Sequence, residues 1–151
     1  MYYSIKKIAM ANQSFQFSLS TSKNTNQVFA HLVNPNNWWI GLFGETIEGK
    51  SESINDEFSF SAGDGVHYSN QKLIELVTNK RIVWLVTDSN LSFLKSTNEW
   101  AGTKICFDLE IVDGKTKITF THDGLIPQIE CYGGCSSAWT QYLQNLQEHL
   151  Q

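Results

Sequence analysis

The sequence contains no run of apolar residues long enough to cross a membrane, and the stretch from Met1 to Ile8 lacks the apolar segment of a signal peptide. It also lacks a basic stripe, because its 11 Lys and Arg residues are scattered among 15 Asp and Glu residues, with a formal net charge of −4. Proteins that bind nucleic acids neutralise phosphates with clustered cations. We therefore expect no membrane and no nucleic-acid partner, and we expect a cytoplasmic protein.

Cysteine is scarce, with only Cys106, Cys131 and Cys135. The count is odd, and a chain of 151 residues is long enough to fold without a stabilising disulfide. Reduced thiols in a cytoplasm are therefore the simplest expectation. We expect Cys131 and Cys135 to be free, and Cys106 to lie on the strand face opposite Phe107. Because a zinc site needs three or four clustered ligands, and no second pair with typical spacing occurs, no metal site is predicted.

Catalytic motifs are missing as well. The sequence has no Gly-x-Ser-x-Gly elbow. Residues 44–51 match the letters Gly-x-x-x-x-Gly-Lys-Ser, but we expect no phosphate-binding loop there. It shows no internal repeat, linker or low-complexity tract, so we predict a single domain over residues 1–151 with a core at about 14–150. These patterns predict no catalytic residue and no cofactor.

Aromatic residues, in contrast, are abundant: the chain has nine Phe, five Tyr and five Trp. Bulky rings that outnumber the needs of a small core either line a ligand cavity or simply pack the interior. Composition alone leaves both interpretations open.

The N-terminal part of the chain predicts a strand followed by a short helix. Residues 14–20 alternate between apolar and polar side chains, as in a half-buried strand. Asn24 and Gln27 have the spacing of a capping box, which begins a helix that runs to about Val33. Pro35 ends this helix, because proline disfavours helical geometry in the residue before it.

From Gly44 to about residue 123 the sequence indicates strands joined by tight turns. Asp-Gly pairs, as in Gly63-Asp64-Gly65 and Asp113-Gly114, are typical of β-hairpins. The predicted order of elements is a strand, short helices, six strands and a long helix. The clearest of the later strands are 66–77, 81–87, 104–112 and 117–123.

The C-terminal segment predicts an amphipathic helix. Residues 136–149 are expected to form one continuous helix with Trp139, Leu143 and Leu146 buried, because apolar residues recur at helical spacing and glutamines occupy the opposite side.

The start of this helix is less well defined. Pro127 suits a first-turn position, and we favour a start there. Gly133-Gly134 then lies inside the helix, at a cost of about 1 kcal/mol each relative to alanine. A start near Ser136 avoids that cost and is the alternative.

One amphipathic helix cannot cover a flat sheet of this width, so the sheet must curl round it. The predicted fold class is therefore α+β: a helix-grip fold, in which a curled antiparallel β-sheet wraps round a long C-terminal α-helix, with short helices after the first strand. A cavity is expected where sheet and helix close on each other.

The order of elements, with Val28-Phe29 and Pro35-x-x-Trp38, resembles the START-like, or birch-pollen-allergen-like, superfamily. Later segments resemble one branch of it, the homologues of the activator of the heat-shock-protein-90 ATPase. The likeness covers residues 14–150 and implies a helix-grip fold and a hydrophobic pocket without a cofactor, in a superfamily that includes carriers, cyclases, hydroxylase domains and co-chaperones. The segments are Arg81-Ile82-Val83-Trp84, Trp100-x-Gly102-Thr103, Gly114 to Leu125, Glu130-Cys131-Tyr132, and Trp139-x-x-Tyr142-Leu143-x-x-Leu146.

Two histidines are candidate polar groups of the cavity. His122 continues the inward face set by Ile118 and Phe120, so its imidazole is expected to point towards the helix. There it either hydrogen-bonds a ligand or acts as an acid or base, or it is a partly buried histidine bonded to a neighbouring carbonyl. His67, just after the Gly-Asp-Gly turn, has the same two interpretations.

The expected cavity walls include Trp84, Trp139 and His122, with Trp38 or Trp39 near one mouth. The full set of candidate ligand-binding residues is Trp38, Trp39, Phe58, Phe60, His67, Trp84, Trp100, Phe107, His122, Cys135, Trp139 and Leu143.

The function expected from these features is the binding of a small apolar molecule. One alternative is a stress-response or co-chaperone-type module, whose partner is a chaperone or another protein. The other is an enzyme of cyclase or hydrolase type that uses His122 or His67.

Overall fold

The computed structural model describes residues 13–151, so the prediction made for Met1 to Ile8 lies outside the described residues. The elements are β1 (Phe15–Thr21), α2 (Thr25–Leu32), the short 3-10 helix η1 (Pro35–Asn37), β2 (Thr46–Gly49), β3 (Glu57–Ala62), β4 (His67–Val77), β5 (Arg81–Leu91), β6 (Lys104–Val112), β7 (Lys115–Asp123) and α3 (Tyr132–His149).

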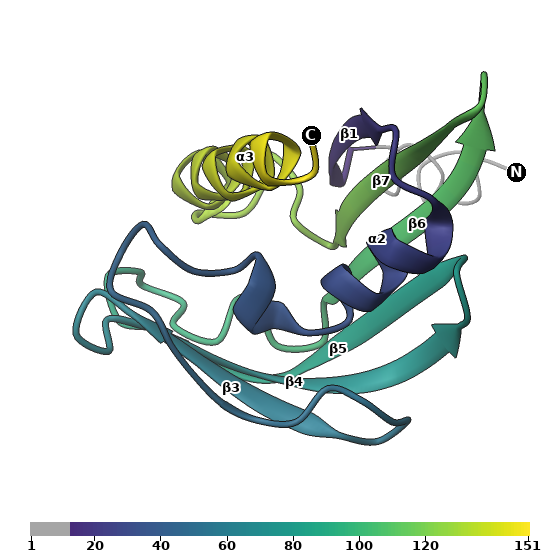
Figure 1. The fold of residues 1–151 in the computed structure, drawn as a ribbon. Helices are drawn as coiled ribbons and strands as arrows, with labels where there is room; N and C mark the ends of the chain where they lie inside the picture. Colours follow the sequence, from purple (N-terminus) through teal and green to yellow (C-terminus); the bar gives the residue numbers. More distant parts are fainter. Residues whose placement is uncertain (1–12) are drawn as a thin grey trace, which may run out of the picture.

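Seven strands form one sheet in the order β1-β7-β6-β5-β4-β3-β2, and every neighbouring pair is antiparallel. The sheet curls, with α2 inside the curl and α3 across its open side next to β1 (Figure 1). The predicted helix-grip fold and its order of elements are confirmed.

Local sequence explains most of the element boundaries. The Asn24 side chain accepts the N–H of Gln27 at 2.8 Å, and the Gln27 side chain accepts the N–H of Asn24 at 3.2 Å, so the capping box begins α2 as predicted. Asp113 and Gly114 adopt φ of 53° and 74°, the left-handed pair that a tight β6–β7 hairpin requires. Strands next to each other in the sequence therefore pair directly.

The C-terminal helix packs its apolar face onto the concave side of the sheet. Trp139, Leu143 and Leu146 are all buried, which confirms the prediction for residues 136–149. Around Trp139 lies an interior dominated by large rings. The fully buried aromatic side chains are Trp39, Trp84, Trp139, Phe58, Phe60, Phe107 and Phe120.

The start of α3 differs from the preferred prediction, because the helix begins at Tyr132 and not at Pro127. The chain before it makes two successive turns, in which Ile126 accepts the N–H of Ile129 and Ile129 accepts that of Tyr132. The alternative start near Ser136 is also wrong, and the paired glycines Gly133-Gly134 lie inside the first turn of α3.

The prediction of free thiols at Cys131 and Cys135 is wrong. The structure joins the two as a disulfide across the first turn of α3, with their Cα atoms 5.5 Å apart. Residues four apart lie on the same side of a helix, and this separation is ordinary for a disulfide. Cys106 is free and buried on β6, on the face opposite Phe107 as expected.

Within residues 13–151, no helix is both long enough and apolar enough to span a membrane.

Candidate functional site

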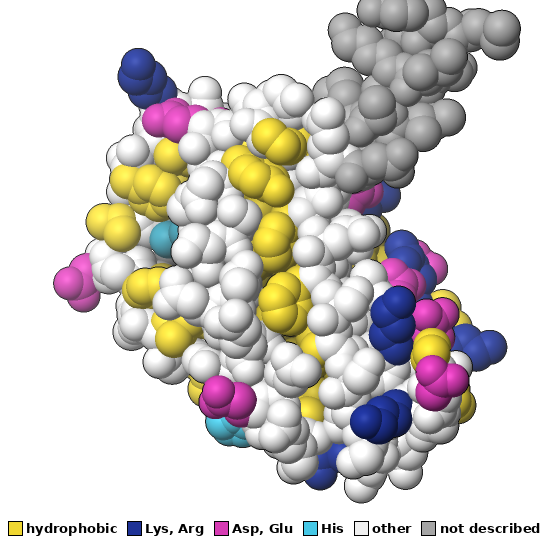
Figure 2. Space-filling view, turned by 90° about the horizontal axis from the view of Figure 1, so that it is seen from above, with side chains coloured by type: hydrophobic (Ala, Val, Ile, Leu, Met, Phe, Trp, Pro, Cys, Tyr) yellow, Lys and Arg dark blue, Asp and Glu magenta, His cyan; other side chains and the backbone are white. Residues whose placement is uncertain are grey.

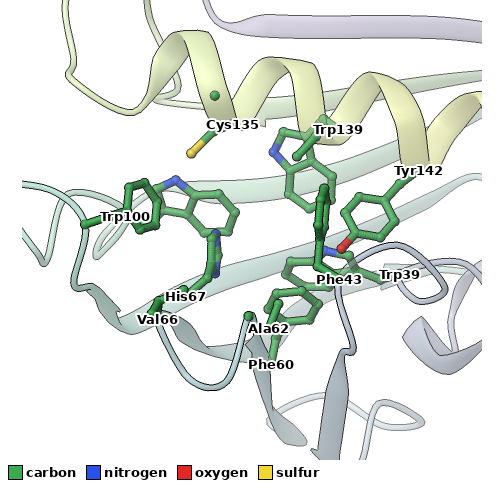
Figure 3. A pocket seen from close by; sticks show the side chains of 14 residues that line it. Trp39, Phe43, Phe60, Ala62, Val66, His67, Trp100, Cys135, Trp139 and Tyr142 are labelled. Carbon is green, nitrogen blue, oxygen red and sulfur yellow. The ribbon is translucent and has the colours of Figure 1, made fainter.

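A pocket of about 250 Å³ lies between α3, the β3–β4 hairpin, the β5–β6 loop and the segment after η1 (Figure 3). An apolar cavity of about 150 Å³ holds a benzene molecule, so this volume suits about two fused rings. The lining residues are Trp39, Phe43, Phe60, Ala62, Gly63, Val66, His67, Phe93, Trp100, Gly134, Cys135, Ala138, Trp139 and Tyr142.

Four large rings from four parts of the fold form the inner walls. Trp39 stacks on Phe60, with ring centroids 4.0 Å apart and planes 12° apart. Trp100 stacks on Trp139 at 5.7 Å with the same angle between planes. The two rings of each pair therefore cover each other's facing surfaces and give the pocket rigid apolar walls.

The mouth of the pocket is apolar as well. Phe43, Val66 and Phe93 all line it, yet their side chains are 46%, 47% and 54% exposed. Figure 2 shows hydrophobic side chains gathered with a histidine on one side of the molecule, whereas a dense group of charged side chains lies on the other side. Exposed apolar residues that gather in one place mark a site of interaction.

The helix α3 faces the pocket with small residues. The small residues are Gly134, Cys135 and Ala138, which line the pocket from the same helix as Trp139. They leave room that larger side chains would fill. Of these three residues, only Cys135 is among the predicted candidate binding residues.

His67, the first residue of β4, lines the pocket and packs against the wall of rings. Its imidazole meets Trp100 edge to face at 4.7 Å and Phe60 at 5.4 Å. The Nδ1 atom is buried and has no hydrogen-bond partner in any other described residue. Burial lowers the pKa of His67 to about 4, so the ring is neutral at physiological pH.

His122 is fully buried and does not line the pocket. The indole N–H of Trp139 donates to His122 Nδ1 at 3.0 Å, and His122 Nε2 lies 2.8 Å from Thr103 Oγ1. Burial, followed by the charge of His67, lowers the pKa of His122 to about 3. The expectation that this imidazole forms part of the cavity wall is therefore wrong. Both of its nitrogens are hydrogen-bonded to other side chains inside the core.

The predicted candidate residues divide into two groups of six. Those that line the pocket are Trp39, Phe60, His67, Trp100, Cys135 and Trp139, and those packed elsewhere in the core are Trp38, Phe58, Trp84, Phe107, His122 and Leu143. Trp84, an expected wall residue, instead donates its indole N–H to Ser51 Oγ at 2.9 Å. Both groups face the concave side of the fold, and only the packing separates them.

Glu45 fixes the loop that carries Phe43. Its carboxylate accepts the backbone N–H groups of Gly41, Leu42 and Phe43 at 2.9 to 3.1 Å, and the hydroxyl of Tyr142 on α3 donates to it. Burial raises the pKa of Glu45, but the bonds from Tyr142 and the backbone outweigh it and hold this pKa below its usual value. The pocket mouth is thereby tied to the helix.

Glu99 ties the β5–β6 loop to the start of α3 in the same way. Its carboxylate accepts the N–H of Glu130 at 3.1 Å and that of Cys131 at 2.8 Å. Backbone N–H groups at a helix start need acceptors, and a carboxylate also suits the positive end of the helix dipole. This contact explains why α3 begins just after Cys131.

No group of three or more potential metal ligands occurs in the part of the chain that the structure describes.

Comparison with known proteins gives one family and many structures of the same fold. The family model described as "Activator of Hsp90 ATPase homolog 1-like protein" matches residues 24–151. No curated protein matches the chain.

Several solved structures are similar over nearly their whole length. The Aha1 dimer from Colwellia psychrerythraea is 20% identical, with a TM-score of 0.70, over 91% of this chain and 95% of that one. Protein MLL2253 from Mesorhizobium loti is 17% identical, with a TM-score of 0.69, over 89% and 94%. A protein from Arthrobacter aurescens is 13% identical, with a TM-score of 0.68, over 89% and 84%. At these identities the likeness establishes the fold.

Proposed function

The chain belongs to the family of activator-of-Hsp90-ATPase-homolog-1-like proteins, and on this premise we propose that its pocket binds a small apolar molecule. The observation that carries the proposal is the unfilled pocket itself, which lies among rings and is faced by small residues of α3. Pockets that bind small molecules are mostly apolar and largely formed before the ligand arrives. The six candidate residues outside the lining support the walls in this proposal.

Gly134 offers a direct test, because it lines the pocket and an added Cβ would meet no atom within 4 Å. Gly134→Leu therefore fills the pocket without a backbone clash. Gly133→Leu is the matched control, since Gly133 is also free of neighbours within 4 Å but does not line the pocket. Both variants exchange glycine for a better helix former, so both should be at least as stable as the parent.

The measurement is a titration with 1-naphthylamine, a neutral two-ring dye whose fluorescence shifts in apolar surroundings. We expect Gly134→Leu to weaken dye binding by about tenfold or more and Gly133→Leu to leave it within about twofold. Equal binding by the parent and Gly134→Leu would show that the dye, and by extension a ligand, does not use this pocket.

A second candidate function is a co-chaperone-type interaction module. The family description supports it, and so does the exposed apolar rim of Phe43, Val66 and Phe93, which suits a protein partner. The test is the ATPase rate of an Hsp90-class chaperone with and without this protein. Stimulation that disappears in Phe43→Ser/Phe93→Ser would support the module, and an unchanged ATPase rate would exclude this role.

The alternative function is an enzyme of cyclase or hydrolase type that uses His122 or His67. His122 is not available for acid–base chemistry, because both of its nitrogens are hydrogen-bonded inside the core. Any acid–base chemistry in the pocket would rest on His67.

A further inference from the structure

We propose that the molecule bound in the pocket is uncharged, has the size of about two fused rings, and places one hydrogen-bonding atom at His67. This inference rests on the proposed binding function and adds the chemical class of the ligand. It follows from the charges, the volume and the unused hydrogen-bonding groups of the lining.

The lining offers no counter-ion. None of the lining residues among positions 13–151 is Asp, Glu, Lys or Arg. The carboxylate beside the mouth, that of Glu45, is already occupied by three backbone N–H groups and the Tyr142 hydroxyl. A charged ligand would therefore lose its water without gaining an opposite charge, which is strongly unfavourable.

The lining has few polar groups, and one of them is already hydrogen-bonded to a residue outside the lining. The Tyr142 hydroxyl donates to Glu45. Two buried lining atoms lack a hydrogen-bond partner in any other described residue: the indole nitrogen of Trp100 and Nδ1 of His67. Buried polar atoms without partners are rare in folded proteins and ask for an explanation.

His67 is the better placed of these two groups to meet a ligand. It stands at the start of β4, beside the exposed Val66 and within 6.2 Å of the exposed Phe93 ring, whereas Trp100 is only 2% exposed. A neutral imidazole has one donor and one acceptor, so a hydroxyl or carbonyl oxygen can pair with it.

The size and shape of the ligand follow from the walls. A volume of about 250 Å³ excludes long lipids and large polycyclic molecules from complete burial. The rings of Trp39, Phe60, Trp100 and Trp139 give the pocket aromatic walls, which favour an aromatic molecule. A bicyclic aromatic with one hydroxyl group satisfies all three constraints.

Isothermal titration calorimetry with three naphthalene probes tests charge and hydrogen bonding separately. Neutral 2-naphthol carries the oxygen, naphthalene lacks it, and 2-naphthoate carries a negative charge. We expect 2-naphthol to bind the parent protein about threefold to tenfold more tightly than naphthalene, the gain of one hydrogen bond. We expect 2-naphthoate to bind at least about 30-fold more weakly than 2-naphthol.

The variant His67→Phe keeps an aromatic ring and removes both nitrogens. It should bind naphthalene as the parent does and lose the preference for 2-naphthol. The neutral dye used for Gly134→Leu separates the two proposals. If the dye binds and 2-naphthoate matches 2-naphthol, or His67→Phe retains the preference, the inference about the ligand is wrong although the pocket binds. If neither the dye nor the probes bind, the binding function and the inference fail together.

Discussion

At the scale of single residues, His122 shows how burial and hydrogen bonding fix a protonation state. Because Trp139 donates to Nδ1, the imidazole proton sits on Nε2 and is donated to Thr103 Oγ1, whose hydroxyl donates to the carbonyl of Trp100 at 2.6 Å. If Nδ1 of His122 were protonated, its N–H would face the indole N–H of Trp139, and neither donor would have an acceptor. The chain of bonds joins α3 to the β5–β6 loop only while His122 is neutral.

The stability of the protein should therefore fall in mild acid. The pKa of His122 is about 6.5 in the unfolded chain and about 3 in the folded one, so between these values the unfolded chain binds a proton that the folded chain does not. The free energy of unfolding should drop by up to about 1.4 kcal/mol per pH unit below pH 6.5 through this histidine. His67, whose pKa falls to about 4, acts in the same direction.

Urea unfolding of the parent and of His122→Gln between pH 4.5 and 7.5, followed by tryptophan fluorescence, measures this effect. The other carboxyl and histidine groups contribute to both proteins, so the difference between the two curves isolates His122. We expect that difference to shrink steadily as the pH falls below 6.5. Parallel curves would show that His122 does not carry the pH dependence.

The disulfide between Cys131 and Cys135 gives a second prediction at this scale. Mass analysis without a reductant should find the intact chain lighter by two hydrogen atoms, and reduction should restore them. The bond closes a very short loop, so its removal should lower the free energy of unfolding by about 2 kcal/mol or less. The double variant Cys131→Ala/Cys135→Ala should unfold identically with and without the reductant, and a parent protein indifferent to reductant in both mass and stability would refute the pairing.

At the scale of elements, three contacts besides the Trp139–His122 bond hold α3 to the rest of the fold. Glu99 accepts the N–H groups at its start, the hydroxyl of Thr21 on β1 donates to the carbonyl of Leu150 at its end, and a buried apolar face lies between. Most of the helix's stability comes from that face, because isolated helices of this length are marginal in water.

Leu146 measures the contribution of the buried face. It is 2% exposed, and Leu146→Ala should lower the free energy of unfolding by about 2–5 kcal/mol, the usual range for a leucine truncated in a packed core. The neighbouring Asn145→Ala removes an exposed side chain of the same helix and should change stability by no more than about 0.5 kcal/mol. Chemical denaturation gives both numbers, and similar losses would mean that Leu146 is not a core residue.

At the scale of the whole molecule, the pocket lies where separate parts of the chain meet, and a ligand there bridges all of them. Glu45 and Glu99 each link a loop to α3, so the mouth and the helix form one connected wall. A ligand that binds only this assembled state must stabilise the fold as a whole.

Thermal and chemical unfolding in the presence of the neutral dye tests this linkage. At a free dye concentration of about 100 times its Kd, the free energy of unfolding should rise by about 2.7 kcal/mol. Gly133→Leu should show the same gain, and Gly134→Leu should show little of it. A gain of equal size in Gly134→Leu would mean that the dye stabilises the protein from another site.

The sequence determined the features that depend on neighbouring residues. Alternating side chains set the strands, the left-handed Asp113-Gly114 pair set a hairpin, and Asn24 with Gln27 set the start of α2. Helical periodicity predicted the buried face of α3. Each of these follows from contacts a few residues apart, so the local sequence carries the information.

Only the tertiary structure decided the start of α3 and the membership of the pocket. The start of α3 depends on Glu99, whose carboxylate accepts the N–H of Cys131 although the two residues are 32 positions apart in the sequence. The second depends on how the sheet curls under the helix: Trp84 and His122 face inward as predicted, but their nitrogens bond to Ser51, Trp139 and Thr103 in the core. Periodicity shows which face of a strand is buried, and it cannot show which buried side chain borders an empty volume, because that depends on every element packed above it.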